Sequence, residues 1–244
     1  MRASMTATRR TFLTLAATAL AGGWRRGLRA QAAGPGQYAL GIDSDRDGLL
    51  YLPSGYRPGT PMPLLVLLHG AGGTAQSVYY AFPMADRHGV IILAPDSRDQ
   101  RSWDLVLGHY GPDADFLSTA LGQTMGRCSV DRNRLLIGGH SDGASQALSF
   151  GIGTGDLFGR ILAFSPGVMR PVDARGRPRI FISHGIADPV MPIDVTARTF
   201  VPRLRRLGYD VTYREYDGRH AVPPEVVDEG FRWAFEGWAP TGPR

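Results

Sequence analysis

Lysine is absent from this 244-residue chain, and all 27 of its basic residues are arginine. Without a lysine amine, the chain cannot form a lysine Schiff base, attach pyridoxal phosphate or build a Ser-Lys dyad. Cys128 is the single cysteine. It excludes an internal disulfide and a Cys-x-x-Cys metal or redox site, so we interpret it as a small apolar residue near a helix end. No apolar run reaches the roughly 18 residues of a membrane span, so no stable span is predicted.

Acidic residues are absent from the first 32 positions, which hold six arginines. The formal net charge of the chain is +5. Removing the six leader arginines from the 27 basic residues leaves 21 against 22 acidic residues. The basic balance therefore belongs to the leader, and it does not indicate a nucleic-acid partner.

The leader has the order of an export signal. A twin arginine at positions 9–10 precedes a moderately apolar stretch, which resembles a Tat signal, and a small-x-small cleavage triplet follows at 30–32. We predict a Tat-type signal over residues 1–32, with transient contact to the Tat export machinery. Residues 33–244 are then one catalytic domain, periplasmic or secreted. The alternative is a basic tail on a cytosolic protein.

Short apolar runs alternate with helical patterns along the rest of the chain. Continuous apolar runs are typical of parallel strands that are covered on both faces. The alternation predicts an α/β fold with a mostly parallel, doubly wound sheet. The first strand pair is expected to be antiparallel, and residues 166–178 are too few for a large lid. Strands are expected at Leu49–Leu52, Leu64–Leu68, Val90–Leu93, Leu135–Ile137, Ile161–Phe164, Ile180–Ser183 and Val211–Tyr216. Helices are expected at Ser77–Arg87, Ala114–Gly126, Asp142–Gly151, Val195–Leu207 and Glu225–Phe235.

A G-x-S-x-G pattern lies between an expected strand and an expected helix, at Gly139-His140-Ser141-Asp142-Gly143. Such glycines permit the strained turn that lifts a serine hydroxyl above the sheet. The pattern predicts Ser141 as a nucleophile. The alternative is a simple glycine turn in which the serine caps the helix.

A second glycine-rich segment, His69-Gly70-Ala71-Gly72-Gly73, also follows an expected strand. Bare glycine backbone allows amide N–H groups to approach the anionic oxygen of a tetrahedral intermediate. We predict the N–H groups of Ala71 and Asp142 as the oxyanion donors, with Gly72 as an alternative. A phosphate-binding loop is disfavoured because no Gly-Lys-Ser/Thr follows.

Asp188 and His220 each follow an expected strand, and they complete the chain order Ser, Asp, His. The histidine would take the serine proton and return it to the leaving group. The carboxylate would fix the histidine tautomer. Asp194 and Asp217 remain competitors for the role of Asp188.

Two further histidines are expected to support these turns, and a third lies inside the elbow. His69 would brace the glycine-rich segment, and His184 would support the turn to Asp188. The ring of His140, inside the elbow, is expected to point away from Ser141.

Two other features allow two interpretations each. Asp43-Ser44-Asp45-Arg46-Asp47-Gly48 resembles the start of a calcium loop, but position 54 is serine where an EF-hand needs glutamate. A hairpin turn is preferred there. Trp103 follows the expected strand Val90–Leu93, and it either lines the substrate pocket or packs in the core.

Together, these motifs resemble the α/β-hydrolase superfamily, in particular its phospholipase/carboxylesterase group. Polyhydroxybutyrate depolymerases and feruloyl esterases are similar relatives. The resemblance implies Ser141, Asp188 and His220 as a catalytic triad. It also implies hydrolysis of esters or thioesters through an acyl-enzyme, without a metal or organic cofactor. Dienelactone hydrolases share the outline but use cysteine, whereas position 141 is serine.

The preferred hypothesis is an esterase for short or medium acyl chains, acting on small-molecule or exposed ester substrates. Three alternatives stay open. A polyester depolymerase is disfavoured because disulfides and a polymer-binding domain are missing. A peptidase of the prolyl oligopeptidase group is disfavoured because that group normally carries a propeller domain, which this sequence does not show. A silent binding protein on a hydrolase scaffold would not need the complete set of serine, acid, histidine and glycines.

Overall fold

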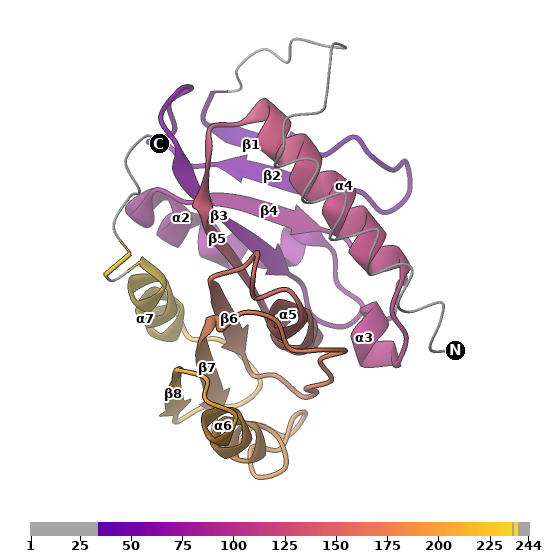
Figure 1. Ribbon diagram of the computed structural model, residues 1–244, viewed down its shortest axis with the longest axis vertical. Helices are drawn as coiled ribbons and strands as arrows, with labels where there is room; N and C mark the ends of the chain where they lie inside the picture. Colours follow the sequence, from indigo (N-terminus) through magenta and orange to yellow (C-terminus); the bar gives the residue numbers. More distant parts are fainter. Residues whose placement is uncertain (1–33, 236, 239–244) are drawn as a thin grey trace.

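A computed structural model describes residues 34–235 and 237–238, so the predicted export signal, residues 1–32, lies outside the described residues. The described part contains one eight-stranded sheet with the order β1-β2-β4-β3-β5-β6-β7-β8 (Figure 1). The strands are β1 (Gly36–Ala39), β2 (Gly48–Leu52), β3 (Met62–Leu68), β4 (Ile91–Pro95), β5 (Val130–His140), β6 (Arg160–Phe164), β7 (Arg179–Gly185) and β8 (Val211–Tyr216). The helical elements are the 3-10 helix η1 (Ala75–Ala81), α2 (Phe82–His88), α3 (Asp104–Leu107), α4 (Pro112–Arg127), α5 (Asp142–Gly153), α6 (Ala197–Arg206) and α7 (Pro224–Phe235).

The sheet is mostly parallel, as the apolar runs predicted. The strands from β3 to β8 pair in parallel, while β2 pairs antiparallel with both β1 and β4. The expected antiparallel first pair is therefore confirmed. From β3 the chain passes to β4 on one side and later to β5 on the other side. In α/β sheets, such a reversal opens a crevice at the carboxyl ends of the two central strands, where ligands bind.

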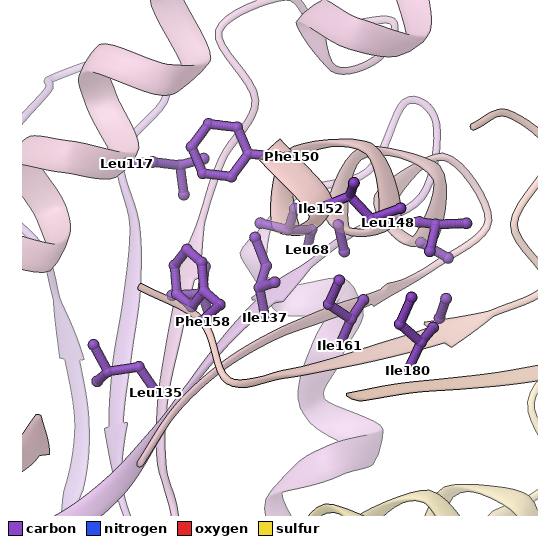
Figure 2. Close-up of a cluster of buried hydrophobic side chains, with 14 of the residues drawn as sticks. Leu68, Leu117, Leu135, Ile137, Leu148, Phe150, Ile152, Phe158, Ile161 and Ile180 are labelled. Atoms are coloured by element: carbon purple, nitrogen blue, oxygen red, sulfur yellow. The ribbon is translucent and has the colours of Figure 1, made fainter. Parts of the chain in front are cut away.

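Helices cover both faces of the sheet (Figure 1). One face packs against α4, α5 and α6 in a large apolar cluster. The other face packs against η1, α2 and α7. Figure 2 shows part of the first cluster, where Phe150 and Ile152 of α5 lie over strand residues such as Ile137 and Ile161. These two layers hold the strand ends, and the loops they carry, in a fixed arrangement.

Four elements differ from the sequence-based expectation. The single helix expected at Ser77–Arg87 is two elements, because Pro83 lies in the first turn of α2 and has no N–H to continue the preceding helix. β5 begins at Val130, five residues before the expected start. The early start was missed because residues 131–134 are polar. β1 is a mostly exposed edge strand without an apolar run, and α3 is a single turn. Both lack the periodicity on which the prediction depended.

Within the described residues, none of the helices is both long enough and apolar enough to cross a membrane.

Candidate active site

Ser141 lies in a sharp turn between β5 and α5. Its backbone has φ 59° and ψ −123°, a left-handed conformation that costs a non-glycine residue about 1–3 kcal/mol. The turn is fixed by hydrogen bonds from the Ser141 N–H to the Phe164 carbonyl, 2.9 Å, and from the Ser145 N–H to the Ser141 carbonyl, 3.0 Å. The serine is therefore held in one strained position at the end of the sheet.

The two glycines of the elbow are required by close backbone packing. A Cβ atom on Gly143 would lie 2.1 Å from the Leu68 carbonyl oxygen. A Cβ atom on Gly139 would lie 2.4 Å from the carbonyl carbon of Gly143. Neither contact can be relieved by a side-chain rotation, because the opposing atoms belong to the backbone. The G-x-S-x-G spacing thus follows from the contact between the elbow and β3.

The structure brings Ser141, His220 and Asp188 into one hydrogen-bonded chain. The His220 Nε2 atom lies 2.8 Å from the Ser141 Oγ, and its Nδ1 atom lies 2.6 Å from the Asp188 Oδ2. The three residues follow β5, β8 and β7, whose carboxyl ends meet at one edge of the sheet. Both imidazole nitrogens are engaged, so the ring can accept a proton from serine while the carboxylate orients it.

Asp188, and neither of its competitors, is the carboxylate at His220. Its side chain is fully buried, and its Oδ1 atom accepts the N–H groups of Val190 and Met191 at 2.9 Å each. Burial alone would raise the pKa of Asp188, but the hydrogen bonds from Met191, His220 and Val190 outweigh it and hold that pKa below its usual value. Asp194 is 77% exposed and pairs with Arg198 on α6 at 2.8 Å, while Asp217 is exposed.

Two further histidines lie beside the hydrogen-bonded Ser141, His220 and Asp188. The His184 Nε2–H donates to the Met191 carbonyl at 2.7 Å and lies 3.3 Å from the Asp188 Oδ2, so His184 supports the Asp188 turn as expected. The His140 ring packs beside the His220 ring, with 4.9 Å between centroids, a contact the sequence did not predict. Burial, followed by the charge of His220, lowers the pKa of His140 to about 4, and burial also lowers the pKa of His184. Both rings are therefore neutral near pH 7.

The glycine strip, residues 69–73 after β3, passes directly beside the nucleophile. A Cβ atom on Gly70 would lie 3.4 Å from the Ser141 Cβ. Asp142 is the first residue of α5, so its N–H has no partner within the helix and lies at the positive end of the helix dipole. The Ala71 N–H belongs to the same strip. Among the described residues, neither of these two amides donates to a protein acceptor.

Gly72 requires a correction. Its N–H donates to the Arg101 carbonyl at 2.9 Å, so this amide is already paired and we remove it from the candidate oxyanion donors. The residue adopts φ 64°, a conformation that favours glycine. The sequence could not distinguish Gly72 from Ala71, because the acceptor lies in a distant loop.

His69 braces the glycine strip, as the sequence suggested. Its Nδ1–H donates to the Gly70 carbonyl at 2.7 Å, and its Nε2 accepts the Ser97 N–H at 3.1 Å. The side chain is only 2% exposed, and burial lowers the pKa of His69. A neutral ring with one donating and one accepting nitrogen fits both contacts.

A model of the esterase family, described as "Putative esterase", matches residues 41–191 of this chain. The chain belongs to this esterase family. It is 30% identical over 106 residues to acyl-protein thioesterase 1 of Gibberella zeae, covering 39% of this chain and 45% of that protein. It is 26% identical over 168 residues to feruloyl esterase C of Emericella nidulans, covering 64% of this chain and 61% of that protein. The chain thus spans about half to three fifths of the length of these curated relatives.

Solved structures show the same fold. A ferulic acid esterase from Anaeromyces mucronatus, determined in complex with ferulic acid, superimposes with a TM-score of 0.63 at 17% identity. The match covers 84% of this chain and 91% of that structure. The predicted α/β-hydrolase fold is therefore confirmed.

Trp103 does not line a pocket. Its side chain is 0% exposed, its Nε1–H donates to the His69 carbonyl at 2.8 Å, and its ring lies 4.7 Å from the His69 ring. Of its two expected roles, lining the substrate pocket or packing in the core, the structure shows the second, with the side chain against His69 of the glycine strip. The sequence placed Trp103 correctly after β4 but could not give the direction of its side chain.

The acidic segment at residues 43–48 belongs to the hairpin connection between β1 and β2. The Asp47 carboxylate accepts the N–H groups of Gly41, Ile42 and Asp43 at 2.7, 2.8 and 3.2 Å. Arg46 in the same loop donates to the Gly73 carbonyl at 3.0 Å. The preferred hairpin interpretation is confirmed, and the loop also supports the end of the glycine strip. No cluster of three or more metal-ligating side chains occurs in the described part of the chain.

Proposed function

We propose that this esterase hydrolyses carboxylic esters through a serine acyl-enzyme, with Ser141 as the nucleophile. The observation that carries the proposal is the hydrogen-bonded chain from the Ser141 Oγ through both nitrogens of His220 to the Asp188 carboxylate. Nucleophile, base and orienting acid within hydrogen-bond reach of one another are the geometric signature of covalent serine catalysis. Membership of the esterase family agrees with ester substrates.

The first half of the reaction forms the acyl-enzyme. The Ser141 Oγ attacks the ester carbonyl carbon while the His220 Nε2 takes the hydroxyl proton. The carbonyl oxygen becomes an oxyanion, which accepts hydrogen bonds from the N–H groups of Ala71 and Asp142. The carbon–oxygen bond to the alcohol then breaks, and the His220 proton passes to the departing alkoxide. Asp188 stabilises the imidazolium that exists between these two transfers.

The second half regenerates the serine. A water molecule transfers a proton to the His220 Nε2 as its oxygen attacks the acyl carbon. The tetrahedral intermediate again places its oxyanion at the two amides. Collapse breaks the bond to the Ser141 Oγ, which recovers the proton from His220 and releases the carboxylic acid. In both halves, protons and bonds balance with Ser141, His220, the ester and water as the only reacting groups.

We propose short and medium acyl esters as the substrates. The 166–178 segment that follows β6 is short, which supports an accessible site without a large lid. The names of the relatives agree with ester and thioester chemistry in general: one is a thioesterase and one a feruloyl esterase. A polyester depolymerase, a peptidase and a silent scaffold remain the alternatives, and the test below separates the last two from the proposal.

The test is hydrolysis of p-nitrophenyl esters from acetate to palmitate by the mature protein, with labelling by a serine-directed phosphonate. We expect turnover that peaks at a short or medium chain, and one phosphonate bound at Ser141. A maximum at palmitate would contradict the lidless site. Faster cleavage of a peptide p-nitroanilide would favour a peptidase. Absence of both turnover and labelling would favour the silent scaffold.

We also propose that residues 1–32 direct Tat export. The support is the sequence order of twin arginine, apolar stretch and small-x-small triplet. Fusing these residues to a fluorescent protein in a bacterium is expected to place fluorescence outside the cytoplasm. Replacing Arg9 and Arg10 by glutamine should retain it inside. Equal export of both fusions would contradict the proposal.

A further inference from the structure

A partly buried loop segment contacts the glycine strip. We call residues 97–104, which follow β4 and end at the first residue of α3, the clamp segment. Its Ser97 N–H donates to the His69 Nε2 at 3.1 Å, and its Arg101 carbonyl accepts the Gly72 N–H at 2.9 Å. Trp103 adds the hydrogen bond from its indole N–H to the His69 carbonyl, 2.8 Å. The backbone next to the Ala71 amide is therefore held on both sides by one segment.

The same segment also holds the second proposed oxyanion donor. The Ser102 hydroxyl donates to the Asp142 Oδ2 at 2.5 Å, and Ser102 and Asp142 are 3% and 8% exposed. Asp142 begins α5, far along the chain from the glycine strip. The clamp segment is thus a common support for two amides that sequence separates and that must face one oxygen atom.

The clamp segment is fixed near both of its own ends by one side chain, Asp113 of α4. The Asp113 Oδ1 accepts the Arg98 N–H at 2.6 Å, and its Oδ2 accepts the Asp104 N–H at 2.7 Å. The Asp104 side chain in turn binds the backbone of Asp113: its Oδ2 accepts the N–H groups of Asp113 and Gly111 at 2.8 and 3.1 Å. The two carboxylates therefore lock the clamp segment to the start of α4.

Burying two carboxylates together is costly. Asp104 and Asp113 are 2% and 1% exposed. Burial, with the charge of Asp104, raises the pKa of Asp113 to about 7. The Arg98 guanidinium, which donates to Asp43 at 3.1 Å and packs on the Phe116 ring at 3.6 Å, is a nearby positive charge that lowers the pKa of Asp113 in part. Four accepted backbone amides offset part of this cost, and all four order the clamp segment and its neighbouring turn.

We propose that Asp113 is a positioning residue for the oxyanion hole, acting through the clamp segment on the amides of Ala71 and Asp142. The inference rests on the function proposed above. Asp113 touches neither the nucleophile nor its base in the structure, so its effect passes through the Arg98 and Asp104 amides. A shift of about 1 Å in an oxyanion donor is enough to cost up to about 100-fold in rate.

Asp113→Asn and Asp113→Ala test the proposal. Asparagine keeps one accepting oxygen but turns its NH₂ group toward the other backbone amide, and alanine removes both acceptors. Phosphonate labelling, taken to completion, gives the concentration of active sites. Dividing the rate by that concentration gives a kcat that does not depend on how much of the variant is folded. We expect kcat to fall about 10- to 100-fold with little change in KM. Affinity for an alkyl boronic acid, whose tetrahedral adduct places an oxygen in the oxyanion hole, should fall by a similar factor.

The matched control is Asp115→Asn, an exposed acid in the same first turn of α4. It should keep the wild-type kcat and boronate affinity. If the Asp113 variants do not fold, Ser102→Ala removes the Asp142 contact alone and should show the same pattern with a smaller drop. Unchanged kcat and boronate affinity in folded Asp113 variants, or in Ser102→Ala when these do not fold, would overturn the positioning role and leave the proposed function intact. Absence of Ser141-dependent turnover in the wild type would overturn both.

Discussion

Replacing Ser141 by alanine is expected to lower kcat for the best p-nitrophenyl ester by about a millionfold. Alanine has no oxygen to form the acyl-enzyme, while His220 and the two proposed amide donors remain in place. Any residual activity would come from water attack assisted by those groups. Substrate binding should change little, because a hydroxyl is removed and nothing is added. Steady-state kinetics over the ester series, together with mass spectrometry after phosphonate treatment, measure both effects.

The matched control for this variant is Ser44→Ala, an exposed serine in the β1–β2 hairpin. It should retain wild-type turnover and the phosphonate adduct. A Ser141→Ala protein that keeps more than a small fraction of wild-type turnover would exclude Ser141 as the nucleophile. Circular dichroism should show the same fold for both variants, since alanine can occupy the elbow position with no added bulk.

Replacing Asp188 by asparagine is expected to lower kcat by about 10⁴-fold. The N–H groups of Val190 and Met191 bind the Oδ1 atom, so they should retain the amide oxygen of asparagine there. The NH₂ group would then face the His220 Nδ1, which must become an acceptor. The proton moves to the His220 Nε2, and that atom can no longer accept the proton of Ser141. The rate should therefore fall through the wrong tautomer, without loss of the fold.

Asp194→Asn and Asp217→Asn are the controls, because the sequence offered these two residues as alternatives. Asp194 pairs with Arg198 at the surface, and Asp217 is exposed, so both variants should keep nearly full activity. Comparing kcat for the three variants on one ester gives the assignment directly. A large loss in either control, with normal turnover by Asp188→Asn, would reassign the acid of the site.

Much of the fold could be predicted from local sequence patterns. The runs Leu64–Leu68 and Ile161–Phe164 predicted buried strands, because a strand covered on both faces needs apolar residues at every position. Their boundaries fall within two residues of β3 and β6. The start of β5 was missed because residues 131–134 are all polar, so composition there did not differ from that of a loop.

The contacts that support the site could not be predicted in the same way. Trp103 and Gly72 each had a local pattern that fitted two roles, and the partner that decided the role lay far away in the chain. The supporting role proposed for Asp113 had no local signal in the sequence. Its accepted hydrogen bonds from Arg98 and Asp104 depend on how the loop after β4 folds back onto α4.

By itself, the sequence determined the α/β class, the strained serine elbow and the order of the candidate serine, acid and histidine. These depend on local rules: apolar periodicity, glycine where backbones touch, and polar residues directly after strands. Tertiary structure alone decided that Asp188 reaches His220, that the Gly72 amide is already paired, and that the clamp segment joins the two proposed oxyanion donors. Such contacts depend on distances of a few ångströms between residues far apart in the chain. Those distances are fixed only when the sheet and its two helical layers pack together.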